Sequence, residues 1–281
     1  CKIASEYTVT EDGNGYIPQS ITYYGTVNNE DLFIVGIEKM QKNGAFFYMI
    51  GSLSNGKFVE KKRFYVNNSA GYEQPQDIFY HSKYGLFIVT NKKADGAFTI
   101  YNMLLCAKIP DELSSVENIG TYYPTSEFRF NGNSNYSKLV VKSIYITDDG
   151  TLYLSTNATT ASTSSDNYDK DAIFRAQNPS FKNGSQKNVL QDIFYSPSHG
   201  LFYVTFTSTT RIYRLLPEQI EQASDEPLVP VAVYNKDDAI YEIESLVISD
   251  SGTLYIAQNC DSEFTKDDAV TQIGALSFIS K

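Results

Sequence analysis

Tryptophan is absent from the 281-residue chain, and histidine and cysteine are scarce, with two and three residues respectively. Cys106 and Cys260 fall in strand-like runs, and neither lies in a CxxC or Cys/His spacing of the kind that holds zinc or supports redox chemistry. They are either two half-buried free thiols or the two halves of one disulfide. The sequence therefore predicts neither a metal site nor a cofactor.

The chain is also short of positive charge, since 23 Lys and Arg residues face 33 Asp and Glu residues, for a net charge of −10. Such a surface repels nucleic acid and anionic membranes, so neither is an expected partner. No apolar run reaches the roughly 20 residues that a membrane-spanning helix needs, and no transmembrane segment is expected. A protein or a carbohydrate remains as the expected partner.

The abundant residues favour β-strands. Tyr and Phe number 22 and 17, and with Ile, Val and Leu they form short runs that suit a pleated, half-buried surface. The sequence has no sustained 3.6-residue period of the kind that indicates long helices, and residues 217–223 are expected to form at most a short helical turn. The chain is therefore expected to be all-β.

One two-strand pattern recurs five times, and a repeat of this kind decides the fold. The first strand opens with a polar residue, and two copies read QDIFY, at 76–80 and 191–195. A short turn rich in Gly, Asp, Asn or Ser leads to a second strand that begins with Leu and an aromatic residue. The predicted first strands are 19–23, 76–80, 142–146, 191–195 and 244–248, and the second strands are 32–35, 86–89, 152–155, 201–204 and 254–257.

Weaker patterns complete each repeat. Third strands are predicted at 45–50, 97–101, 172–175, 211–215 and 275–279, and fourth strands at 58–66, 116–123 and 231–234. The central Ile or Leu of the first strand recurs every 49 to 66 residues, and kelch-like propeller blades run at about 50. The interval from Leu246 through the C-terminus and on from residue 1 to Ile21 is one further blade length. The circle then closes if residues 2–9 supply the outer strand of the last blade.

The sequence thus predicts a single five-bladed β-propeller domain of four-stranded antiparallel blades, closed by the N-terminal strand, which removes an exposed edge. The expected blades are 18–66, 75–123, 140–189, 190–234 and 243–279 with 2–9. A six-bladed propeller is the alternative, with a degenerate blade in the longest interval, between blades 2 and 3.

The first strands, with a polar residue, alternating apolar residues and a Gly or Asp turn, resemble the NHL-like and YVTN-like repeat propellers. The chain lacks their usual Pro-x-Gly entry, since Pro18 and Pro75 precede Gln-Ser and Gln-Asp. The resemblance implies blades and no particular chemistry. Cys1 resembles the lipid-bearing first residue of mature bacterial lipoproteins, which implies lipid attachment there and a place on the cell surface; a plain boundary of the sequence is the alternative.

Polar residues recur where a channel mouth is expected, because first strands start and second strands end at the same rim of an antiparallel blade. They either cap strands at a hydrated mouth or form a pocket that hydrogen-bonds a ligand. Ile37 and Phe206 are assigned to the equivalent second-strand places of the other two blades. The predicted ligand-binding residues are Gln19, Gln76, Lys142, Gln191 and Glu244 from first strands, and Asn91, Asn157 and Asn259 from second strands.

Asp77 and Asp192 occupy equivalent positions in blades 2 and 4, where the other blades have Ser. Paired carboxylates can do acid and base chemistry. The alternative is that Asp and Ser here hydrogen-bond the adjoining backbone. His81 and His199 fall in turns on the opposite face, which argues against a His-activated nucleophile at the mouth.

Long connections also fall on the mouth face, at 124–138, 158–170 and 261–271, and loops of this kind usually carry recognition. The first is rich in aromatic residues and includes a cation. The predicted partner surface is Tyr123, Phe128, Arg129, Phe130 and Tyr136.

Two functions follow from these patterns. The first is a non-catalytic, monomeric, extracytoplasmic propeller, secreted or lipid-anchored, that binds a protein or a glycan through its loop-rich face. The alternative is a propeller enzyme, a glycoside hydrolase or a lyase, with Glu244 and one of Asp77 or Asp192 as acid and base.

Overall fold

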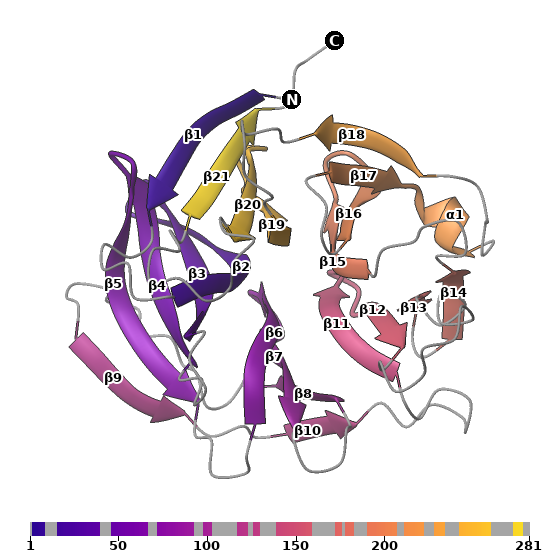
Figure 1. Ribbon diagram of the computed structural model, residues 1–281, viewed down its shortest axis with the longest axis horizontal. Helices are drawn as coiled ribbons and strands as arrows, with labels where there is room; N and C mark the ends of the chain where they lie inside the picture. The colour runs from indigo at the N-terminus through magenta and orange to yellow at the C-terminus, as the bar shows by residue number, and fades with distance from the viewer. Residues whose placement is uncertain are drawn as a thin grey trace.

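A computed structural model describes residues 2–8, 16–39, 46–66, 72–92, 98–102, 117–122, 126–129, 139–158, 172–175, 178–182, 190–206, 211–221, 228–233, 242–259 and 272–277. Most of these residues lie in β-strands, and α1 (Pro217–Glu221) is the only helix among them. The strands are arranged radially around a central axis (Figure 1). Within this described part, no helix has the length and apolar character needed to cross a membrane.

The strands form five antiparallel units of four, here called units 1 to 5, in which each strand pairs with the next. The first strand of each unit lies nearest the axis (Figure 1). Unit 1 contains β2 (Tyr16–Val27), β3 (Glu30–Lys39), β4 (Phe46–Ser54) and β5 (Lys57–Val66); unit 2 contains β6 (Tyr72–His81), β7 (Gly85–Lys92), β8 (Phe98–Asn102) and β10 (Ser126–Arg129); unit 3 contains β11 (Leu139–Ile146), β12 (Leu152–Ala158), β13 (Ala172–Arg175) and β14 (Asn178–Lys182); unit 4 contains β15 (Leu190–Ser196), β16 (Leu201–Phe206), β17 (Arg211–Leu215) and β18 (Val229–Val233); unit 5 contains β19 (Glu242–Ile248), β20 (Leu254–Asn259), β21 (Gln272–Ser277) and β1 (Lys2–Thr8).

Second strands read as continuous apolar runs because both of their faces are covered. Leu32, Phe33, Ile34 and Val35 of β3 are all at most 2% exposed. A strand with one solvated face would alternate polar and apolar residues instead. The unbroken Leu-aromatic-apolar pattern therefore indicates strands that are packed between neighbouring units.

The turns between first and second strands follow from their residues. Asn28 and Asn29 both have positive φ, 52° and 63°, as a two-residue hairpin turn of the I′ type requires. In unit 3 the turn ends at Gly150 with φ of 86°, and its N–H donates to the Thr147 carbonyl at 2.8 Å. These turns fix where each second strand begins.

The five first strands contact one another in sequence around the axis. β2 contacts β6, β6 contacts β11, β11 contacts β15, β15 contacts β19, and β19 contacts β2. Phe194 of β15 packs against three hydrophobic clusters of described core residues, which places it where the units converge. At the outside, β1 pairs with β21 from Lys2 to Thr8, and a bridge between Thr8 and Lys57 links it to β5.

Most of the predicted strands are present, including the N-terminal one, but one assignment is wrong. Residues 116–123 were expected to be the fourth strand of the second blade. Instead β9 (Glu117–Tyr122) pairs in parallel with the outer edge of β5 in unit 1, from Lys62 to Val66, and β10 completes unit 2. The outer strand of unit 1, β5, has ten residues, whereas the outer strand of unit 2, β10, has four. By pairing with β5, β9 covers a longer row of edge backbone groups than unit 2 offers.

Candidate functional site

All five first strands carry a β-bulge at the same place. The register with the second strand shifts between Pro18 and Ser20, and the same shift recurs in each of the other units. One residue is left without a partner in the ladder, and such a bulge re-aims a side chain. The five bulged residues are Gln19, Gln76, Lys142, Gln191 and Glu244, which the sequence had assigned to the channel mouth. This ring of residues is called the bulge mouth below.

Side chains of the bulge mouth are described for three of these residues. Gln19, Gln191 and Glu244 are 9%, 7% and 5% exposed. The Gln191 Nε2 atom donates to the Glu244 Oε2 atom at 2.7 Å, from β15 to β19. The structure therefore brings together two predicted residues from neighbouring units, in a buried, charge-assisted hydrogen bond.

The Gln191 carbonyl oxygen, Oε1, is the other end of this amide. It is buried, and no described residue gives it a hydrogen bond. Leaving a buried acceptor unsatisfied costs about 1–3 kcal/mol, so such an atom is a point where a ligand gains free energy by donating. The bulge mouth thus contains one prepared acceptor beside one carboxylate.

In four of the five units, the residue after the bulge links its unit to the next one. This residue is Ser or Asp, and its side-chain oxygen accepts from the backbone N–H of the central Ile or Leu in the following first strand. The bonds run from Asp77 to Ile144 at 2.9 Å, from Ser143 to Ile193 at 3.0 Å, from Asp192 to Leu246 at 2.7 Å, and from Ser245 to Ile21 at 3.2 Å. The equivalent oxygen of Ser20 is buried and has no hydrogen-bond partner among the described residues.

Asp77 and Asp192 are therefore engaged in holding the units together. The second oxygen of each carboxylate accepts from the following residue in its own strand, Ile78 at 2.8 Å and Ile193 at 2.7 Å. Burial raises the pKa of Asp192 to about 7. Burial, together with the charge of Asp192, raises the pKa of Asp77 well above its usual range. This geometry favours the backbone-binding alternative over acid and base catalysis by these two residues.

The register also corrects the second-strand part of the ring. Glu38 pairs with Ile17 just beyond the bulge, as Asn259 pairs with Glu242, so Glu38 is the unit 1 equivalent of Asn259. Ile37, assigned there from sequence, lies one residue too early, and Phe206 in unit 4 is shifted in the same way. Glu38 is 7% exposed and adds a carboxylate that the sequence reasoning missed.

Other predicted residues cannot be placed in the site by their side chains. Only the backbone is described at seven of them, which are Gln76, Lys142, Asn91, Asn157, Asn259, Phe128 and Arg129. Six others lie outside the described residues, namely Cys1, Cys106, Cys260, Tyr123, Phe130 and Tyr136. Among the side chains that are described, no three His, Cys, Asp or Glu residues gather where a metal ion could be held.

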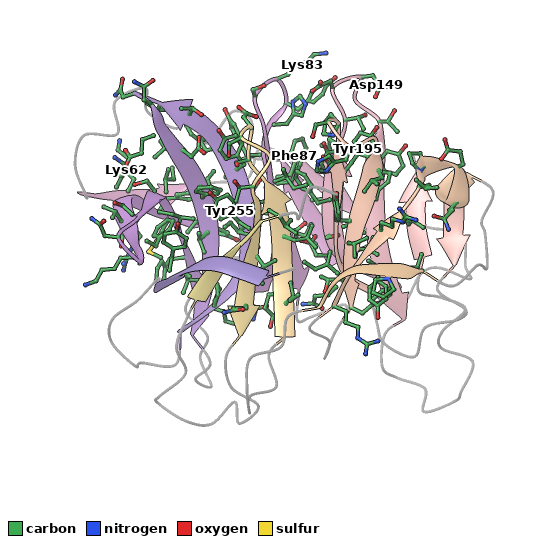
Figure 2. All side chains as sticks on the ribbon, turned by 90° about the horizontal axis from the view of Figure 1, so that it is seen from above. Lys62, Lys83, Phe87, Asp149, Tyr195 and Tyr255 are labelled. Atoms are coloured by element: carbon green, nitrogen blue, oxygen red, sulfur yellow. The ribbon has the colours of Figure 1, made fainter. Side chains whose placement is uncertain are left out.

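Both histidines lie at the opposite end of the molecule, in the turns after the first strands. The His81 Nε2 atom lies 3.0 Å from Asp148 Oδ1, and the His199 Nδ1 atom lies 2.8 Å from the Tyr203 hydroxyl. Figure 2 shows Lys83 and Asp149, from two of these turns, together at this end of the molecule. The two histidines are therefore bound to local partners, away from the bulge mouth.

Comparison with known proteins identifies the fold. No protein-family model and no curated protein sequence matches the chain. Among solved structures, a thermostable family-43 glycoside hydrolase aligns with TM-score 0.57 and 11% identity over 98% of this chain and 94% of that one. A putative exo-β-1,3-galactanase from Bifidobacterium bifidum aligns with TM-score 0.56 and 9% identity, over 100% and 94%. The periplasmic gluconolactonase of Pseudomonas aeruginosa is a weaker likeness, with TM-score 0.41 and 12% identity, over 86% of this chain and 65% of that one.

At such low identity the likeness concerns the fold and not the activity. The chain is a β-propeller protein.

Proposed function

We propose that the protein is a five-bladed propeller, closed by β1, that binds a carbohydrate at the bulge mouth. Units 1 to 5 are the five blades, a domain spanning residues 2–277 in the described part. Support for five comes from direct contact between β6 and β11, which leaves no room for a sixth blade between units 2 and 3. Support for closure comes from the Ser245–Ile21 hydrogen bond between the last and first units and from the β1–β21 pairing.

The observation that carries the binding proposal is the bulge repeated five times around the axis. Each copy places one residue at the same rim, and four of the five are Gln or Glu. Amide and carboxylate groups are the hydrogen-bond partners that sugar hydroxyls use, and a few convergent polar groups in a largely apolar surrounding define a ligand site. The similar glycoside hydrolase and the putative exo-β-1,3-galactanase are named for carbohydrate chemistry, which favours a glycan over a protein partner.

The test is a thermal-shift screen with xylotetraose, arabinotetraose and β-1,3-galactotriose, because a ligand of the native state raises the melting temperature by mass action. Wild type is expected to shift with at least one of them. The variant Gln191→Met, which keeps the side-chain length and removes the acceptor, is expected to lose most of the shift. Asp250→Asn, in an exposed turn at the opposite end, is the control and should shift as wild type does. No shift with any glycan at millimolar concentration contradicts the proposal.

Hydrolysis is a second candidate function, and one observation favours it. Glu38 supplies a second buried carboxylate on the blade adjacent to that of Glu244, and glycoside hydrolysis uses two carboxyl groups about 5 to 10 Å apart. Release of new reducing ends from the same glycans tests it. Glu244→Gln and Glu38→Gln are expected to abolish that release while binding persists, and an absence of reducing ends with wild type restricts the protein to binding.

A further inference from the structure

We infer that the bulge mouth selects neutral or amino sugars, which place a hydrogen-bond donor there. It rejects glycans that place a carboxylate or sulfate there. Gln191 and Glu244 set this selectivity. The inference rests on the proposed carbohydrate binding and narrows its substrate class.

The first step is that Glu244 fixes which way the Gln191 amide points. An ionised carboxylate has acceptors and no donor, whereas an amide has one acceptor end and one donor end. With 2.7 Å between Gln191 and Glu244 Oε2, the atom facing the carboxylate must be the amide nitrogen. The reversed amide would bring two acceptor oxygens into contact. Glu244 in its ionised form therefore holds the Gln191 amide nitrogen towards itself and leaves the amide oxygen pointing away from it.

The second step is that this orientation leaves an acceptor for the ligand. Gln191 Oε1 is buried and receives no hydrogen bond from a described residue, and the side chain as a whole is 7% exposed. The residue also sits at the bulge, whose backbone position is held by the flanking pairs of Leu190 with Phe206 and Asp192 with Thr205. A hydroxyl or ammonium group can satisfy this oxygen, and a carboxylate or sulfate oxygen cannot.

The third step is the charge beside it. Glu244 is 5% exposed, and in its ionised form it would repel an anionic group of the ligand at short range, because solvent screens a buried charge only weakly. The net charge of −10 for the whole chain acts in the same direction at longer range. Lys142 occupies the bulge of unit 3 and is the one cationic residue among the five, so replacing it tests whether an anionic ligand binds through it.

The experiment compares matched glycans by titration calorimetry. The probes are xylotriose with and without one glucuronic acid branch, and β-1,3-galactotriose with and without oxidation of its terminal C6 to a carboxylate. Wild type is expected to bind the neutral member at least about tenfold more tightly, since a tenfold ratio corresponds to about 1.4 kcal/mol, the scale of one hydrogen bond. Glu244→Gln frees the amide to turn either way and is expected to reduce that ratio at least fivefold. Asp250→Asn removes a charge at the opposite end and is expected to keep it.

The outcomes separate this inference from the proposal beneath it. If wild type binds none of the neutral or acidic glycans, the proposed carbohydrate binding itself fails and the inference falls with it. If the acidic member binds as tightly as the neutral one or more tightly, and Lys142→Met weakens it, carbohydrate binding stands and the inference is overturned. A thermal melt of Glu244→Gln, alone and with the neutral glycan, tests whether the variant is folded and still binds.

Discussion

The Oδ2 atom of Asp192 in unit 4 accepts a 2.7 Å hydrogen bond from the backbone N–H of Leu246 in unit 5, so a fully buried carboxylate joins two neighbouring units. Its other oxygen accepts from Ile193, and Asp77 does the same between units 2 and 3. Ser143 and Ser245 make the same link with a shorter side chain. Stability and site geometry are therefore coupled, because each linking residue directly follows a bulge residue of the mouth.

Asp192→Ala is expected to lower the free energy of unfolding by about 2–4 kcal/mol, because it leaves the Leu246 N–H buried without an acceptor. Asp192→Ser is expected to lose less, since Ser makes this link at two other units. Urea denaturation followed by fluorescence of the tyrosines measures both. Equal losses for Ala and Ser would contradict the linking role.

The stability of the protein should fall as the pH rises from about 4 to 7 on account of Asp192. Its pKa is raised to about 7 in the fold by burial, so folding takes up a proton in this range. This contribution is fully present below the pKa of the unfolded chain and is lost as the pH rises through the folded value. The difference in unfolding free energy between wild type and Asp192→Ser, measured from pH 4.5 to 8, should therefore change with pH. A constant difference would show that Asp192 does not titrate there.

Two serines at equivalent positions are expected to respond differently to removal of the hydroxyl. Ser245→Ala should cost about 1–2 kcal/mol, because it leaves the Ile21 N–H without its side-chain acceptor. Ser20→Ala should change stability by less than about 0.5 kcal/mol, because the Ser20 oxygen is buried and has no hydrogen bond from a described residue. The two variants control for one another in thermal melts, and a larger loss at Ser20 would contradict the assignment.

Gly150 is expected to tolerate Ala less well than Gly200 does. Both have positive φ, 86° and 65°, so each substitution strains the backbone by about 1 kcal/mol. A Cβ at Gly150 would also lie 2.9 Å from the Tyr84 hydroxyl, whereas nothing lies within 4 Å at Gly200. Chemical denaturation should rank Gly150→Ala below Gly200→Ala. Phe replacing Tyr84 should remove the difference, and its persistence would point to another cause.

The sequence predicted the strands well because their signal is local. Leu followed by an aromatic residue opens every predicted second strand, and the repeated polar residue two places before the central Ile or Leu of each first strand stands at a bulge. The bulges were not predicted, because the sequence shows which residues form each strand and does not show the register at which two strands pair. The register shift at the bulge is why Glu38 was missed and Ile37 was assigned in its place. The partner of β9 was missed for a related reason: sequence shows that a strand exists and not which edge it joins.

The interpretation of Asp77 and Asp192 also needed three dimensions. Two carboxylates at equivalent repeat positions fit either catalysis or backbone binding from sequence alone. Only the positions of the Ile144 and Leu246 N–H groups, 67 and 54 residues away along the chain, show what the carboxylates bind.

The central claim is that a glycan binds at Gln191, and NMR of its side-chain amide tests this most directly. In uniformly ¹⁵N-labelled protein, titration with the best glycan of the thermal screen should shift the Gln191 Nε2 resonances, assigned by their loss in Gln191→Met. The amide of Gln219 in α1, whose oxygen accepts from Leu216 at 2.9 Å, should stay unchanged. Saturating glycan that leaves the Gln191 resonances in place while shifting others would contradict the claim.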